Sequence, residues 1–380
     1  MSTQGAVAPQ LVSAFTAATG IAVDVQPLPW TAAHEKVLTA FAGGALPDIL
    51  MVANDWLAEL AMLGVARPVP GAFAGALPAA GAAVAVDGVP RALPWTLDTQ
   101  VAFFHRGRLG AAGYAAPPAT WHEWRAMGHA LKRRRPDDYP LLLLLDWPEV
   151  LMTWGAQGTE PLLRDRDTRG NFATPGFRAA LAFYVSLFAD GLAAPLVGAQ
   201  AGDTLAGLAQ GRFAVLPSTA STVGDLNQLA GFPHAAWSLA AMPTPGPRPA
   251  PVLLAGASLV VTRDCRDPAR AWQLVRFLCA PAAQRRLHAL TGDLPAASAA
   301  WAEAPLAGDP LAAVFADAFT RGVGAPAVPE WARIVFEVQA IAERTVRGEF
   351  GIDAATAAMD TRVDAILAKR RWLLDRGRPA

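Results

Sequence analysis

Four short stretches of the sequence place tryptophan at the end of an expected element, beside polar residues that include carboxylates and an amide. The negative π face of an indole packs well against the partly positive C–H face of a pyranose ring. Carboxylates accept charge-assisted hydrogen bonds from hydroxyls, and such bonds are about twice as strong as neutral ones. Tryptophan beside acidic and amide groups therefore suits carbohydrate, although tryptophans at such places can also simply cover hydrophobic core. The four stretches lie at Trp30, Asn54-Asp55-Trp56, Trp95 with Asp98, and Asp146-Trp147-Pro148-Glu149.

Each of these groups follows a segment with the character of a β-strand. The segments are Ile21 to Val25, Asp48 to Val52, Val89 to Leu93 and Leu141 to Leu145, the last being a buried strand or the start of a helix. Ligands of open α/β sheets bind beyond the carboxyl ends of the strands. We therefore expect the four groups to point to one place.

Helical periodicity occurs between the expected strands. Thr120 with Glu123 forms a capping-box pattern, and Gly20 and Gly191 stand where helices should end. Alternating helix and strand over the first hundred residues is typical of a mostly parallel α/β sheet. The expected helices are Pro9 to Thr19, Thr31 to Phe41, Thr120 to Leu131, Pro175 to Asp190, Pro268 to Leu278 and two beyond Pro329, and further strands are expected at Val101 to His105, 212–217 and 256–262.

Composition excludes several classes of function. The chain of 380 residues has 32 basic and 32 acidic side chains, so no positive field favours nucleic acid or an anionic bilayer. The longest uncharged stretch, Pro68 to Val86, is broken by proline and glycine, and we expect no transmembrane helix. No Walker, GxGxxG, GxSxG, HExxH or CxxC motif occurs, and the histidines lack metal-ligand spacing. The sequence therefore predicts neither a cofactor nor a metal.

The cysteines and the remaining tryptophans are expected to be structural. Cys265 and Cys279 flank an expected helix of about twelve residues, which places their Cα atoms roughly 18 Å apart. A disulfide needs less than about 7 Å, so both are predicted to be free thiols. Core packing is the expected role of Trp121, Trp124, Trp237, Trp272, Trp301 and Trp372.

Ordered segments along nearly the whole chain resemble the family 1 extracellular solute-binding proteins of sugar ABC transporters, a family of maltose-binding-protein-like receptors. The order of the segments is more specific than any one of them. They are FTAATGIAVDV (Phe15 to Val25), PWTAAHEKVLTAF (Pro29 to Phe41), AGGALPDI (Ala42 to Ile49), GVPRALPWTLDT (Gly88 to Thr99), FFHRGRLGAAGYAAPPATW (Phe103 to Trp121), ALAFYVSLFADGLAAP (Ala180 to Pro195), LTGDLP (Leu290 to Pro295) and VPEWAR (Val328 to Arg333).

The resemblance implies an α/β, two-lobed periplasmic-binding-protein-like fold whose lobes are joined by hinge crossings and close on a ligand. By position, lobe one would comprise residues 1–106 and 257–303, and lobe two residues 107–256 and 304–380. The resemblance also implies a monomer that acts in the periplasm or at the cell surface with an ABC permease and ATPase.

Matching positions carry over the family's ligand-binding roles. Trp30 would be a stacking surface with His34 as a nearby polar group, and Asp98 would accept hydrogen bonds from hydroxyls. Gly256 and Ser258 match a turn of small residues that lets backbone amides approach a ligand. The other positions with an implied ligand-binding role are Asn54, Asp55, Trp56 and Trp95 in lobe one, and Asp146, Trp147, Glu149 and Trp331 in lobe two.

Two departures from the family pattern stand out. Relatives carry a signal peptide and a strand ending in tryptophan before the segment that matches Met1 to Phe15. Met1 to Ala8 has neither the basic nor the apolar region of a secretory signal. This indicates either a truncated start or a cytoplasmic protein. The first strand of lobe one would then be missing from the chain. Gln4 stands where relatives often have a polar residue in the cleft. Ser218, in LPSTAST, stands where close relatives often have a Gly-Pro-Trp turn. A serine in place of that stacking tryptophan would change which sugar fits.

The leading hypothesis is a non-enzymatic receptor that delivers a mono- or oligosaccharide to an ABC importer. Two alternatives stay open. Asp98 and Glu149 would be the acid and base of a glycoside-acting enzyme if their carboxyl groups lay about 5 to 9 Å apart. A receptor of the same fold for a polyol or polyamine is the other alternative, although a polyamine would demand more acidic residues than the mixed set found here.

Overall fold

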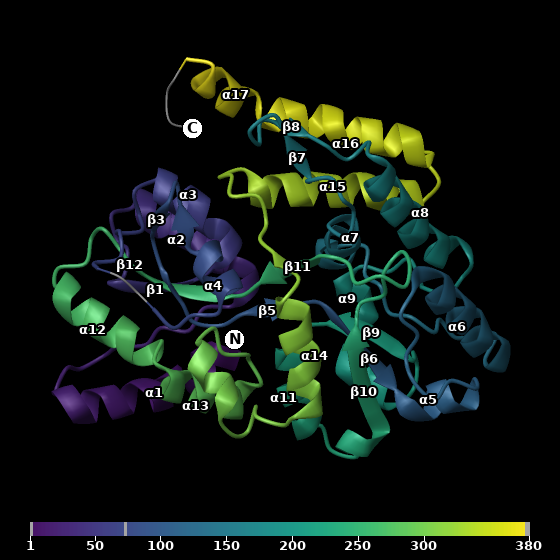
Figure 1. Ribbon diagram of the computed structural model, residues 1–380, viewed down its shortest axis with the longest axis horizontal. Helices are drawn as coiled ribbons and strands as arrows, with labels where there is room; N and C mark the ends of the chain where they lie inside the picture. Colours follow the sequence, from purple (N-terminus) through teal and green to yellow (C-terminus); the bar gives the residue numbers. More distant parts are fainter. Residues whose placement is uncertain (1–2, 72–73, 377–380) are drawn as a thin grey trace. The chain divides into compact units, whose positions relative to one another are not determined.

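The computed structural model describes residues 3–71 and 74–376, which form two compact units (Figure 1). Unit 1 consists of Met1–Asp98, Leu254–Ala313 and Ala327–Pro329. Unit 2 consists of Thr99–Leu253, Val314–Pro326 and Glu330–Ala380. Each unit is thus assembled from segments that are distant in sequence.

Unit 1 contains α1 (Thr3–Thr19), α2 (Trp30–Ala42), β1 (Ile49–Ala53), the 3-10 helix η1 (Asn54–Trp56), α3 (Leu57–Met62), α4 (Pro78–Ala83), β2 (Ala85–Val86), β3 (Val89–Pro90), β4 (Leu93–Pro94), β12 (Ala257–Val261), α12 (Pro268–Leu278), α13 (Pro281–Thr291) and η3 (Ser298–Ala302). Unit 2 contains β6 (Val101–His105), α5 (Arg106–Ala111), α6 (Trp121–Arg134), α7 (Pro148–Gly155), β7 (Leu163–Arg164), β8 (Arg169–Gly170), α8 (Pro175–Ala189), α9 (Gly198–Ala201), α10 (Thr204–Ala209), β9 (Val215–Ser218), α11 (Ser221–Gln228), η2 (His234–Ala236), β10 (Trp237–Ala241), β13 (Gly322–Val323), α15 (Trp331–Val346), α16 (Ile352–Ile366) and α17 (Ala368–Leu374). The chain crosses from one unit to the other within β5 (Asp98–Thr99), β11 (Val252–Ala255) and α14 (Pro310–Phe319).

The sheet of unit 1 has β12 between β1 and β4 and is covered by helices on both faces (Figure 1). Successive side chains of a strand point to opposite faces. Leu50, Val52 and Val260 pack into a core with α2 and α3, whereas Met51 and Leu259 pack against α1, α12 and α13. Because both faces are buried, the end of β1 and the loop that follows it have a fixed position within unit 1.

The strand expected at Ile21 to Val25 does not form. The expected alternation is present, since Ile21, Val23 and Val25 are half-buried against the core and Ala22 and Asp24 are exposed. Among the described residues, however, no strand pairs with this segment. Alternating burial alone therefore does not make a strand, because a strand also needs a partner for its backbone groups.

The expectation of a mostly parallel sheet is also wrong for the two three-stranded sheets around β12 and β6, although the isolated bridges of Leu141 and Leu144 are parallel. β1 and β4 both run antiparallel to β12 in unit 1, and β9 and β10 both run antiparallel to β6 in unit 2. Residues Val252 and Leu253 of β11 do pair in parallel with β13. The neighbours of β1 and β6 come from distant parts of the chain that return in the opposite direction, which the alternation of helix and strand does not reveal.

The core of unit 2 forms around β6 and the helices beside it. Phe104 of β6 makes an edge-to-face contact with Trp124 of α6, and Trp124 makes another with Trp154 of α7. All three are fully buried. The predicted capping box at the start of α6 is confirmed, since Thr120 accepts from the backbone of Glu123 and donates its own N–H to the Glu123 carboxylate.

Most expected helices are confirmed, with differences at their ends. α12 has the predicted bounds, and α2 and α8 agree to within about one residue. α1 begins at Thr3, so Pro9 lies inside the helix instead of starting it. The described part of the tail beyond Pro329, up to residue 376, forms three helices rather than two, and Pro68 to Val86 includes the short helix α4. None of the described helices is both long and apolar enough to span a membrane.

The core packing predicted for these tryptophans is confirmed for four of them, three on helices and Trp237 on β10. Trp121, Trp124, Trp237 and Trp272 are buried. Trp301 is half-buried and donates its Nε1–H to the carbonyl oxygen of Pro295. Trp372 is 46% exposed on α17, so the prediction of a core role is wrong there. The strand expected at Leu141 to Leu145 is buried throughout but makes only isolated bridges among the described residues.

Both cysteines are free and buried, as predicted. Burial raises the pKa of the Cys265 thiol to about 11 and also raises the pKa of Cys279. The thiolate is the reactive form, and a raised pKa means that little thiolate is present at pH 8. We therefore expect neither thiol to react with iodoacetamide in the folded protein at pH 8, and both to react in 6 M urea. Mass spectrometry of the alkylated protein measures this, and rapid labelling without urea would contradict the burial.

Candidate binding site

The loop after β1 places Asn54 against the beginning of β12. The backbone N–H of Asn54 donates to the carbonyl oxygen of Gly256 at 3.0 Å, and the side-chain Oδ1 accepts from the Ser258 hydroxyl at 2.6 Å. Ser258 is fully buried. The Ser258 hydroxyl therefore fixes the Asn54 side chain, whose Nδ2 group has two N–H donors and no partner among the described residues. Such an oriented amide can donate hydrogen bonds to a ligand.

Gly256 is required by the backbone beside this contact. Its φ of +136° lies in a region that L-residues rarely adopt. A Cβ at this position would collide with the carbonyl oxygen of Thr96 and would lie 3.1 Å from the Cα of Leu97. The close approach of these backbone segments is enough to require a glycine here, whether or not a ligand binds nearby.

An aromatic cluster lies next to Asn54 in the chain. Trp30 and His34 are one turn apart on α2, so their side chains share a face. The ring of Trp56 contacts both: its centroid lies 5.1 Å from that of Trp30, with the planes 21° apart, and 4.8 Å from that of His34. Trp30 remains 43% exposed. The cluster therefore presents indole surface to solvent while its other members are half-buried.

Glu59 contacts this cluster and was not among the residues predicted for the site. Its Oε2 lies 2.6 Å from Nε2 of His34, and both side chains are largely shielded from solvent. The spacing in the sequence could have indicated this contact. Trp30 and His34 are four residues apart and Trp56 and Glu59 are three apart, so the members of each pair lie on the same face of a helix.

Asp55 lies between Asn54 and Trp56 and is exposed. The protein around it raises the pKa of its carboxyl by desolvation, an effect that its own backbone hydrogen bond and the nearby His34 partly offset. Water nevertheless reaches this residue. We therefore expect the Asp55 side chain to be available to a ligand.

Three other residues predicted for lobe one occupy different surroundings. Trp95 is buried in the core with α1 and α12, and its indole N–H has no partner among the described residues. Gln4 donates to the carboxylate of Asp293 at 2.8 Å, and Asp293 also accepts from Thr291. Asp98 is half-buried at the start of β5. Of these, Trp95 does not present a ring face at the surface.

The residues predicted for lobe two lie in unit 2 and are partly engaged within it. The exposed carboxylate of Asp146 accepts from the backbone N–H of Gly198 at 2.8 and 3.0 Å. Ser218 bonds the Thr222 hydroxyl at 2.7 Å. Trp331 is buried at the start of α15. Trp147 is half-buried and Glu149 is exposed in the first turn of α7.

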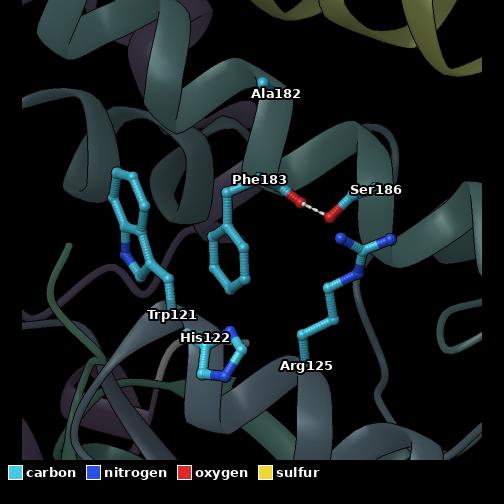
Figure 2. A pocket seen from close by; sticks show the side chains of 6 residues that line it. All are labelled: Trp121, His122, Arg125, Ala182, Phe183 and Ser186. Carbon is cyan, nitrogen blue, oxygen red and sulfur yellow. Dashed lines mark hydrogen bonds between the residues drawn. The ribbon is translucent and has the colours of Figure 1, made fainter. Parts of the chain in front are cut away.

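A surface pocket of about 280 Å³ lies between α6 and α8 of unit 2 and contains none of the predicted site residues (Figure 2). The rings of Trp121 and Phe183 stack in it at 5.0 Å with their planes 5° apart. Arg125 is paired with both oxygens of Asp190, and the Ser186 hydroxyl donates to the carbonyl oxygen of Phe183. The Arg125 and Ser186 side chains are therefore engaged within the protein itself. Its lining is Trp121, His122, Arg125, Ala182, Phe183 and Ser186.

The chain belongs to the family of bacterial extracellular solute-binding proteins, whose family model matches residues 10–314. It is similar to the sugar-binding protein MalE from Xanthomonas citri, with 36% sequence identity, 99% of this chain and 98% of that chain covered, and a TM-score of 0.89. Two more distant structures show the same fold. The GacH receptor of Streptomyces glaucescens, solved unliganded and with acarbose, is 19% identical over 97% of this chain and 96% of that chain, with a TM-score of 0.88.

The second is an ABC transporter solute-binding protein from Thermotoga lettingae bound with α-D-tagatose, which is 21% identical over 95% of each chain, with a TM-score of 0.84. These comparisons confirm the predicted family and the two-lobed α/β fold class. The members of this family are binding proteins rather than enzymes as a class. Among the described residues, no three His, Cys, Asp or Glu side chains gather where they could hold a metal ion.

Proposed function

We propose that this protein is the saccharide-binding component of an ABC importer. The observation that carries the proposal is the exposed indole surface of Trp30, supported by Trp56, together with the oriented amide of Asn54 two residues before Trp56 in the chain. A sugar ring has an apolar face for the indole and hydroxyls for the amide. The 36% identity to a sugar-binding protein further supports a sugar ligand.

The proposal includes the partners and further ligand-binding residues. Units 1 and 2 would be the two lobes of the receptor, and Asp98, Trp147 and Glu149 would also bind the ligand. The protein would function outside the cytoplasm as a monomer and deliver its ligand to an ABC permease with its ATPase. A glycoside-acting enzyme has less support, because the family consists of binding proteins.

Thermal unfolding in the presence of candidate ligands tests this function. The panel contains mono-, di- and trisaccharides, polyols and spermidine, each added to the full chain. A ligand at 100 times its dissociation constant should stabilise the folded state by about 2.7 kcal/mol. We expect a saccharide to raise the melting temperature. A rise with spermidine alone, or release of reducing sugar from a glycoside, would contradict a saccharide receptor.

A further inference from the structure

Glu59 holds one end of the aromatic cluster through a single short contact. The 2.6 Å separation between its Oε2 and Nε2 of His34 requires a hydrogen on that nitrogen, because a carboxylate only accepts. The side chains are 23% and 28% exposed, respectively, so water competes only in part for this bond. The torsion that orients an imidazole ring is intrinsically broad. Glu59 therefore selects one orientation of His34 among several.

That orientation matters because His34 contacts Trp56. The two rings are 4.8 Å apart and tilted by 38°, and Trp56 in turn lies 5.1 Å from Trp30. Trp30 and His34 belong to α2, whereas Trp56 precedes α3, which carries Glu59. The bond between Glu59 and His34 thus joins the two helices at the place where their aromatic residues meet.

We propose that Glu59 is a positioning residue of the binding site, which acts through His34 to keep Trp56 against Trp30. This inference rests on the proposed saccharide function for its effect on affinity. His34 and Trp56 lie between Glu59 and the exposed surface of Trp30, so Glu59 need not touch the ligand. Its role is to reduce the number of orientations that the aromatic cluster adopts before a sugar binds, which lowers the ordering cost of binding.

The test compares three variants of the full chain. Glu59→Ala removes the acceptor, Glu59→Gln keeps an amide oxygen that can accept from His34 Nε2–H, and Glu35→Gln is the matched control on α2 beside His34. Glu35 is exposed. Two readouts apply: sugar affinity by calorimetry, and near-ultraviolet circular dichroism, in which two stacked indoles give a coupled signal that does not depend on a ligand.

We expect Glu59→Ala to weaken sugar binding roughly fivefold, the effect of about 1 kcal/mol, and to reduce the coupled indole signal. Glu59→Gln should restore both, and Glu35→Gln should change neither. The proposal is overturned if Glu59→Ala leaves the indole signal unchanged, or if Glu59→Gln behaves like Glu59→Ala. If the wild-type protein gives the indole signal but binds no sugar, the proposed function fails. The positioning role is then still supported if Glu59→Ala reduces the indole signal and Glu59→Gln restores it.

Discussion

Replacing Trp30 by alanine is expected to weaken saccharide binding about tenfold or more, since large aromatic side chains dominate many binding sites. Trp30 offers its indole surface to solvent while Trp56 supports it from within unit 1. Trp30 is 43% exposed and lies outside the buried core, so the variant should still fold, with some stability lost from its contact with Trp56. Calorimetric titration of the variant with the sugar that binds the wild-type protein measures the loss.

A matched control separates this effect from a general effect of removing an exposed tryptophan. Trp372 is 46% exposed on α17 and contacts Arg376 through its ring. Trp372→Ala should leave sugar affinity unchanged. Equal affinities for wild-type protein and Trp30→Ala would show that Trp30 is not the stacking surface, and the site would have to be sought elsewhere.

Replacing Gly256 by alanine is expected to have the largest effect on stability. The residue has a φ of +136°, and the added methyl group would meet the carbonyl oxygen of Thr96 and the backbone of Leu97. Neither atom belongs to a flexible side chain that could move aside. We expect the free energy of unfolding to fall by about 2 to 4 kcal/mol, the sum of backbone strain and overpacking, as measured by urea denaturation.

Gly81 provides the control for the change of glycine to alanine itself. It lies in α4 of the same unit, its φ is not positive, and an added Cβ would meet nothing within 4 Å. Gly81→Ala should be neutral or slightly stabilising, because alanine is the better helix former. If Gly256→Ala were as stable as Gly81→Ala, the backbone of Gly256 would not lie as close to Thr96 and Leu97 as the structure places it.

Much of the local structure could be predicted from the sequence because it depends on neighbouring residues. The capping box at Thr120 and the helix Pro268–Leu278 are set by residues within a few positions of one another. The strand at Ile21 to Val25 was predicted from the same kind of pattern and does not form. Its formation depends on a partner strand, and the identity of that partner is not encoded in the segment itself.

The site residues likewise fall into those that neighbouring residues predict and those that only distant contacts determine. The loop Asn54-Asp55-Trp56 was predicted from its place after a strand, and the structure puts Trp56 against Trp30 and His34. The bond between Asn54 and Ser258 joins residues 204 positions apart, so only the fold reveals it. Trp95 and Trp331 have the residue type expected of a stacking surface, but tertiary packing buries them. Burial depends on contacts that spacing along the chain does not specify.

The most direct test of saccharide binding at the Trp30 and Asn54 site is calorimetric titration of the folded full chain with a series of mono-, di- and trisaccharides. We predict saturable binding of at least one saccharide with one site per chain. The contradictory result is a protein that unfolds cooperatively, and is therefore folded, yet gives no binding heat with any sugar of the series at several temperatures.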